Sequence, residues 1–194
     1  MENELYRRLD TLLEKMSTKD FQENKGLGNE VGYYVFDYPE QEELKVRDWI
    51  ETQQRKNNSV ILGYTLKVFN LFDILLDLLK EEDILEDTYD IEEEQGIDGI
   101  IGAITDLVEI TETNNNNYFV SLIRNETVQG DVVFITGVGE IFPLIRSHKV
   151  LNTMNLSLDT VPIVMFFPGK YDGATLKIFD KEVDDNYYRA FRIV

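Results

Sequence analysis

The sequence contains no cysteine and a single histidine, His148, and these two shortages exclude several kinds of site. Without thiols there is no disulfide framework and no thiolate metal ligand, which fits a reducing compartment. One histidine leaves mainly carboxylates as metal ligands, and neither a D-x-D-x-D-G loop nor an E-x-x-H pair occurs. Ser147 precedes His148, but adjacent helical residues point about 100° apart. We therefore expect no metal site, no local Ser-His nucleophile and no enzyme activity.

Long apolar runs are also missing, and none approaches the roughly 18 residues that span a bilayer. Residues 1–16 are charged and amphipathic, unlike the apolar core of a secretory signal. We therefore expect a cytoplasmic protein that does not enter a membrane.

Basic residues are scarce: 19 Lys and Arg stand against 37 Asp and Glu, for a formal charge of -18. The imbalance is concentrated in residues 73–112, where fifteen acids accompany one base, Lys80. Proteins bind the DNA backbone by neutralising phosphates with Lys and Arg, so we expect no direct nucleic-acid binding by this chain alone. The acidic segment is either a solvated helical face or a surface for a basic partner.

What the sequence does contain is a series of apolar segments that alternate between strand and helix patterns. Strands are predicted at 31–38, 59–66, 131–137 and 161–169, and helices at 3–16, 39–56, 71–95, 97–110, 118–125 and 139–154. Residues 118–125 are ambiguous, and we favour a helix. In the helix after Pro39 the core-facing residues are predicted to be Leu44, Val46, Trp49 and Ile50.

This alternation predicts an α/β fold of three layers, with a mainly parallel sheet flanked by helices. The expected layout is RecA/P-loop-like but without a Walker A motif. Residues 174–180 and 187–194 both alternate and are a candidate antiparallel edge pair at the C-terminus. We expect a single domain over 1–194, with an acidic helical insert at about 73–117.

The glycine turn Gly137-Val138-Gly139 joins a predicted strand to a predicted helix, which is the usual setting of a phosphate site. The details are wrong for one. No G-x-x-x-x-G-K-[ST] motif occurs, and Phe142 stands where the dinucleotide pattern needs its third glycine. Glu140 directly follows the turn and would repel phosphate. We therefore favour a tight turn with close helix–sheet packing, keep Gly137 and Gly139 only as candidate cofactor contacts, and expect no cofactor.

Two further spots carry charged residues near predicted strand ends. Lys170 lies in "PGKYDG", where a ligand could bind, but Pro-Gly and Asp-Gly are ordinary turn signals and favour a β-turn. Asp184 and Asp185 could hold a divalent ion, but a solvated turn before a terminal strand is the simpler interpretation.

Four segments carry a resemblance to a known family: "KGLGNEVGYYVFDYP", "FITGVGEIFPLIRSHKVLN", "VPIVMFFPGKYDGATLKIF" and "DDNYYRAFRIV". Together they resemble the BrxB family of bacterial phage-exclusion (BREX) systems, over nearly the whole chain and least in residues 73–117. The resemblance implies a small cytoplasmic component of a multi-gene antiphage system. Other components of such systems carry the methyltransferase, the AAA+ ATPase and the alkaline-phosphatase-like protein PglZ. The resemblance to BrxB implies no catalytic motif in this chain.

The resulting hypothesis is a non-enzymatic interaction or scaffold subunit of a BREX complex that docks a PglZ-like partner beside other BREX components. The candidate interface residues are loop and aromatic positions, since aromatics are enriched in interfaces: Gly26, Leu27, Gly28, Asn29, Tyr187, Tyr188 and Arg189. Two alternatives stay open. One is a degenerate nucleotide-binding domain that keeps weak nucleotide binding, and the other is an acidic DNA-mimic module.

Overall fold

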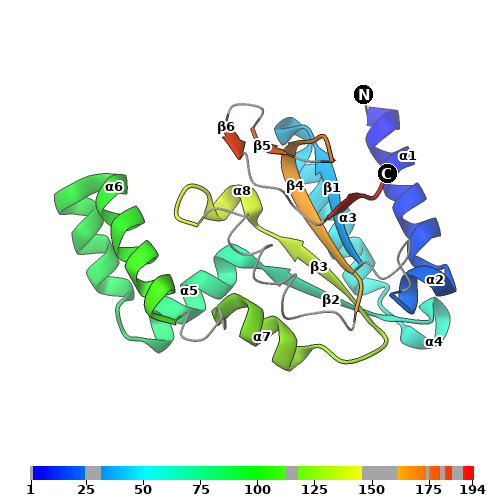
Figure 1. Ribbon diagram of the computed structural model, residues 1–194, viewed down its shortest axis with the longest axis horizontal. Coiled ribbons are helices and arrows are strands. Elements are labelled where there is room, and N and C mark those ends of the chain that lie inside the picture. Colours follow the sequence, from blue (N-terminus) through cyan, green and yellow to red (C-terminus); the bar gives the residue numbers. More distant parts are fainter. Residues whose placement is uncertain are drawn as a thin grey trace.

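The structure, a computed structural model, describes residues 2–24, 32–111, 118–145, 161–173, 175–179, 182–184 and 190–194. Its centre is a seven-stranded sheet in which five parallel strands follow the order β2-β3-β4-β1-β7 (Figure 1). Read from β7, this is the fifth, first, fourth, third and second parallel strand along the chain, the RecA-like layout expected from the sequence. The strands are β1 Tyr33–Tyr38, β2 Thr65–Asn70, β3 Asp131–Thr136, β4 Ile163–Tyr171, β5 Leu176–Ile178, β6 Glu182–Asp184 and β7 Phe191–Arg192.

The three central strands are buried on both faces, as expected for a parallel sheet covered by helices on each side. Successive side chains therefore enter two different cores. Val35 and Ile135 belong to the core on one face, whereas Phe36 and Phe134 belong to the core on the other. The near-continuous apolar runs seen in the sequence are the consequence of this two-sided burial.

One face of the sheet is covered by α1 Glu2–Met16, α2 Lys19–Gln22, the short helix η1 Glu40–Glu42, α3 Glu43–Arg55 and α4 Ser59–Leu62. The helix predicted at 3–16 is confirmed, with Leu5, Leu9, Leu12 and Met16 all buried. In α3 the prediction holds for Val46 and Ile50, which are buried, and Trp49 packs against the same core. It is wrong for Leu44, which is 73% exposed. Leu44 lies two positions from Val46 and so about 200° around the helix.

The strand predicted at 59–66 is only partly correct, because its first half is the helix α4. The Asn58 side chain accepts a hydrogen bond from the Val60 N–H, and Gly63 ends the turn in the left-handed conformation with φ 79°. These caps outweigh the β-propensity of Val60 and Ile61. The strand begins only at Thr65.

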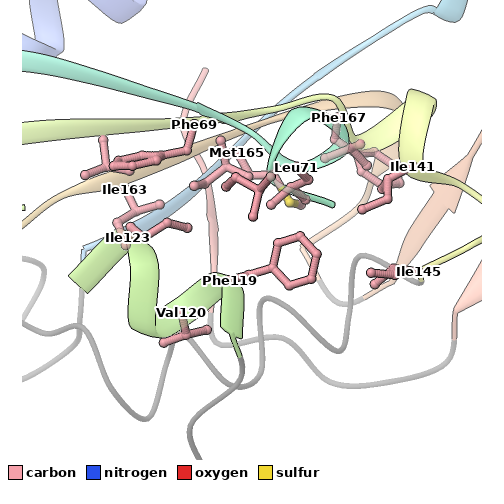
Figure 2. Close-up of a cluster of buried hydrophobic side chains, with 14 of the residues drawn as sticks. Phe69, Leu71, Phe119, Val120, Ile123, Ile141, Ile145, Ile163, Met165 and Phe167 are labelled. Atoms are coloured by element: carbon pink, nitrogen blue, oxygen red, sulfur yellow. The ribbon is translucent and has the colours of Figure 1, made fainter. Parts of the chain in front are cut away.

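The opposite face carries α5 Leu71–Glu81, α6 Leu85–Thr111, α7 Tyr118–Glu126 and α8 Val138–Ile141. Gly96 interrupts α6 with non-helical angles, φ 69° and ψ -164°. Figure 1 shows α6 as an arm beyond the edge of the sheet, and most of the acidic segment lies in it and in α5. The helix favoured for 118–125 is confirmed: Phe119, Val120 and Ile123 of α7 pack beneath the sheet (Figure 2).

The C-terminal part of the sheet differs from expectation in two ways. Strand β4 does not end at Pro168-Gly169 but continues to Tyr171, where it pairs antiparallel with β5. Gly169 makes this possible, since a Cβ there would lie 2.0 Å from the Lys177 carbonyl oxygen. An antiparallel C-terminal pair is present, but β5 pairs with β6, whereas the terminal strand β7 runs parallel to β1.

The helix predicted at 139–154 begins as expected but breaks off after its first turn. Helix α8 ends at Ile141, and Phe142 is extended, with ψ 134°. The cause is Pro143, because a residue that precedes proline is driven out of the helical region. Residues 146–154 lie outside the described part of the chain. No helix in the described ranges is both long and apolar enough to cross a membrane.

Candidate functional site

A pocket of about 430 Å³ lies between α3 and the carboxyl-terminal halves of several strands. Tyr38 of β1, Val68 and Asn70 of β2, Thr136 of β3 and Phe166 of β4 are among the residues that line it. Ligands of open α/β sheets bind outside the carboxyl ends of the strands, where the order of the strands reverses. From β1 the chain runs through α3 to β2 at one end of the sheet, whereas from β4 it continues to β7 at the other end. The strand order therefore reverses between β1 and β4, and both strands line this pocket.

Among the described residues that line the pocket are four carboxylates, from Glu43, Glu51, Asp73 and Glu140, and one cation, Arg47. The formal charge of its lining is therefore -3. Val46 and Ile50 of α3 and Phe166 of β4 add apolar surface to its wall.

Helix α3 places Glu43 and Arg47 one turn apart on the face that looks onto the pocket. The Tyr38 hydroxyl donates to Glu43 Oε2 at 2.6 Å, and Arg47 Nε donates to Glu43 Oε1 at 2.7 Å. The i,i+4 spacing lets the two α3 side chains meet, and the phenol fixes the carboxylate from the β1 side. The Glu43 carboxylate is thus held on both oxygens.

The same arginine reaches across the pocket to the turn after β3. Arg47 Nη1 lies 2.7 Å from Glu140 Oε1, and Asn70 Nδ2 donates to Glu140 Oε2 at 2.9 Å. Asn70 Oδ1 in turn accepts from the backbone N–H groups of Phe72 and Asp73, at 2.8 and 3.3 Å, and so caps α5. One continuous chain of hydrogen bonds and ion pairs therefore joins β1, α3, α8, β2 and the start of α5.

The glycine turn after β3 is what brings Glu140 into this chain. Gly137 has φ 73°, and a Cβ there would lie 2.0 Å from Asn70 Oδ1. A Cβ on Gly139 would lie 3.0 Å from Pro168 Cγ and 3.3 Å from the ring of Phe179. The turn therefore provides close packing and directs a carboxylate, rather than an open nest of N–H groups, toward the pocket.

The arrangement favours cationic groups over anions. Arg47 is already shared by two carboxylates, so an incoming phosphate would have to displace them and meet the remaining acids. Burial works to lower the pKa of Arg47, but hydrogen bonds and charge from Glu43 and Glu140 outweigh it and raise that pKa. Among the described residues, no three acidic or histidine side chains are close enough together to hold a metal ion.

Burial raises the pKa of Tyr38 far above its ordinary value, and the charge and hydrogen bond of Glu43 raise it further. The neutral phenol therefore stabilises the fold below pH 10, about the pKa of an unfolded tyrosine, and this stabilisation is lost as the pH rises above 10.

We expect Tyr38→Phe to flatten the alkaline limb of the stability curve. At pH 7 the variant should lose about 1 kcal/mol, because it lacks the hydrogen bond to Glu43. Above pH 10 its free energy of unfolding should fall less steeply than that of the wild type. Urea unfolding at pH 7 to 11 measures both effects, and parallel alkaline limbs would show that Tyr38 does not stay neutral in the fold.

We expect Gly137→Ala to destabilise the protein by about 2 kcal/mol, since it combines a left-handed backbone with a clash against the Asn70 cap. Gly102→Ala is the matched control, because Gly102 lies inside α6 with nothing within 4 Å of its would-be Cβ. That control should gain up to about 1 kcal/mol from helix propensity. Urea unfolding distinguishes the two, and equal effects would contradict the role given to Gly137.

Of the other predicted site residues, Lys170 and Asp184 are described, and neither lines this pocket. Lys170 is exposed on β4, in register with Lys177 of β5. The interface candidates at 26–29 and 187–189, as well as Ser147, His148 and Asp185, lie outside the described residues. Asp184 is in β6. Sequence reasoning did not single out Arg47 or Asn70, although Asn70 stands between a strand and a helix, as an N-cap should.

Comparison with known proteins decides the family. A family model described as "BREX protein BrxB" matches residues 67–193, about two thirds of the chain. The chain belongs to the BrxB family. BrxB of Bacillus cereus (strain H3081.97) is 43% identical over 189 residues, which cover 96% of each chain. BrxB of Escherichia coli O9:H4 (strain HS) is 30% identical over 189 residues, 96% of this chain and 90% of that protein. No solved structure matches.

Membership makes the chain a component of a BREX system, and so of antiphage defence. BrxB proteins belong to a system of several components, so other BREX proteins are plausible partners. The described pocket lies partly in the matched region, through β2, α5 and the β3–α8 turn, and partly before it, through α3.

Proposed function

We propose that this BrxB protein is a non-enzymatic binding subunit of a BREX complex and that it docks a PglZ-like partner. The observation that carries the proposal is the pocket at the carboxyl end of the sheet. Four carboxylates of described residues line it, and Arg47, the one cation among those residues, bridges Glu43 and Glu140. Nucleotides bind at the carboxyl end of parallel sheets in α/β proteins, and here the carboxylates at that position would repel phosphate.

The turn after β1 adds to this argument. Phosphate sites in P-loop proteins need a glycine-rich turn with a lysine, because backbone N–H groups and an ammonium surround the anion. Here β1 is followed by Pro39 and by η1, whose residues Glu40 and Glu42 are acidic. The chain offers carboxylates where a nucleotide-binding protein offers donors, which counts against the degenerate nucleotide-binding alternative.

Exposed apolar residues support a role in binding protein. Val60 and Ile61 of α4 are 92% and 78% exposed, and Val128 is 66% exposed. The hydrogen bond from Thr65 N–H to the Gly130 carbonyl holds the segment after α4 beside the segment after α7. The segments that carry these side chains thus lie near the amino-terminal ends of β2 and β3, where a contiguous apolar patch would mark a protein contact.

A tagged pull-down from the native host, at low and moderate salt, tests the proposal. We expect the PglZ-like protein of the same defence system among the recovered proteins, and a stable complex when both are purified and mixed. Thermal shift with ATP, GTP and NAD should leave the melting temperature of the isolated chain unchanged. Recovery of no BREX protein, together with a melting temperature that rises with a nucleotide, would overturn the proposal in favour of nucleotide binding.

A further inference from the structure

Strand β2 is the outermost strand at one end of the parallel sheet, and its outer edge is only partly covered. Thr65 donates its N–H to the Gly130 carbonyl, toward β3, so Thr65, Lys67 and Phe69 bond inward. The backbone groups of Leu66 and Val68 therefore point outward. At Leu66 the Asn57 side chain takes the place of a neighbouring strand: Nδ2 donates to the Leu66 carbonyl at 2.9 Å, and Oδ1 accepts from its N–H at 3.0 Å.

Val68 is left without such a cover. Its N–H and carbonyl face the same way as those of Leu66, and no described residue forms a hydrogen bond with them on the outer side. An edge strand with an open N–H and carbonyl is a template on which an extended segment can add.

The open position lies beside the acidic pocket. The Val68 side chain lines that pocket, together with Asn70, Glu51 and Asp73. Residues that stand opposite each other in paired strands point to the same face, so a residue added opposite Val68 would direct its side chain to the pocket face. The edge and the pocket are thus two halves of one surface.

The charges of this surface select the side chain that it takes. Within the described part of the chain, the Asp73 carboxylate has no ion pair or hydrogen bond, and Glu51 pairs only with Arg55, at 3.1 Å and with both side chains mostly exposed. Val46 and Ile50 add apolar surface to the wall of the same pocket. A long basic side chain fits both features, because its methylene stem packs on apolar surface while its charged head stays at the rim.

We propose that an extended segment of a partner protein adds to β2 at Val68 and places a lysine or arginine side chain in this pocket, with Glu51 and Asp73 as its counter-ions. The proposal rests on the proposed function and names the surface that function uses. An acidic segment or a nucleic acid would be repelled by a lining of formal charge -3. The acidic α5 and α6 would also raise the association rate of a basic partner at low salt.

Titration of the 194-residue chain with the purified PglZ-like protein, followed by calorimetry at low and moderate salt, tests the proposal. Val68→Pro removes the outward N–H but keeps the β2–β3 ladder, because the inward bonds come from Thr65, Lys67 and Phe69. We expect at least a tenfold loss of affinity. Val68→Thr keeps the N–H and nearly the same shape, so it should lose far less affinity than Val68→Pro. Circular dichroism establishes that each variant is folded.

A second pair of variants tests the charge. Glu51→Gln with Asp73→Asn should weaken binding severalfold at low salt and reduce its dependence on salt. Asp77→Asn with Glu86→Gln removes the same charge from α5 and α6 outside the pocket, and should have a smaller effect. If Val68→Pro is folded and both it and the double pocket variant bind like the wild type, the inference is wrong while the proposed function stands. If the wild-type chain binds no BREX protein at all, both fail.

Discussion

Replacing Asp37 with alanine should lower the free energy of unfolding by about 3 kcal/mol, one of the largest effects expected of any single substitution in this chain. Asp37 lies near the carboxyl end of β1 and is only 4% exposed. Its Oδ1 accepts from Arg8 Nη2 at 2.7 Å and from Arg192 Nε at 3.0 Å, and its Oδ2 accepts from the Tyr171 N–H at 3.1 Å.

This one carboxylate ties together segments from both ends of the chain. Arg8 comes from α1, Arg192 from β7 and Tyr171 from the end of β4. Without Asp37, Arg8 would remain largely buried without its counter-ion, stacked over the Phe36 ring at 4.8 Å. Arg192 is half-exposed, so water would replace part of its interaction, and for that reason we place the loss at the low end of the range for buried pairs.

Urea unfolding of the Asp37→Ala variant measures the effect, and its melting temperature should fall by about 6 to 12 °C. Asp77→Ala is the control. Asp77 also pairs with a basic residue, Lys80 at 2.9 Å, but both side chains are mostly exposed, and the change should be below about 0.5 kcal/mol. Equal losses for the two variants would mean that burial of the Asp37 pair adds nothing to stability.

Much of the fold follows from local pattern. The strands β1, β3 and β4 are apolar on both faces, and this alone predicts a sheet covered by helices on each side. Errors arose where a local feature outweighed the pattern. Asn58 and Gly63 cap a helix turn in a segment of β-formers, and Gly169 lets a strand continue through a Pro-Gly pair that ordinarily makes a turn.

The candidate site could not be predicted in the same way, because even its hydrogen-bonded side chains come from four separate elements, β1, α3, β2 and α8. Glu43 and Arg47 are one helical turn apart and could be paired from the sequence, but Asn70 and Glu140 are 70 positions apart. Only the parallel pairing of β2 with β3 brings the ends of these strands together. The sequence did indicate that Glu140 is incompatible with phosphate. It could not indicate that Arg47 holds Glu140 in place.

The sequence likewise could not predict that β2 is an edge strand, because that depends on the strand order. Periodicity reports which residues face a core, but not which strand is outermost. Because β2 is at the edge, the Asn57 side chain can bond the outward backbone groups of Leu66, a role that its position in the sequence does not suggest. The acidic segment of α5 and α6 would then attract a basic partner toward a binding surface that is formed mainly by α3 and β2.

Replacing Phe119 with alanine is the second substitution with a large expected effect, a loss of about 3 to 5 kcal/mol. Phe119 is fully buried in the core on the α7 face of the sheet. Figure 2 shows its ring beneath the sheet among residues of several elements, including Leu71 and Met165. Alanine would leave a cavity bounded by the sheet, and a sheet cannot collapse easily to fill it. Phe119→Leu should lose less, about 1.5 kcal/mol.

The neighbours of Phe119 test whether the residues after 118 form a helix in solution. In the helix α7, Val120 is buried beside Phe119 and Ile123, whereas Ser121 is not. In a strand, Ser121 would share the face of Phe119, and Val120 would point away. Val120→Ala should therefore cost about 2 kcal/mol and Ser121→Ala almost nothing, as measured by urea unfolding. Because α7 and the acidic pocket lie on opposite faces of the sheet, Val120→Ala should leave partner binding unchanged below its melting temperature.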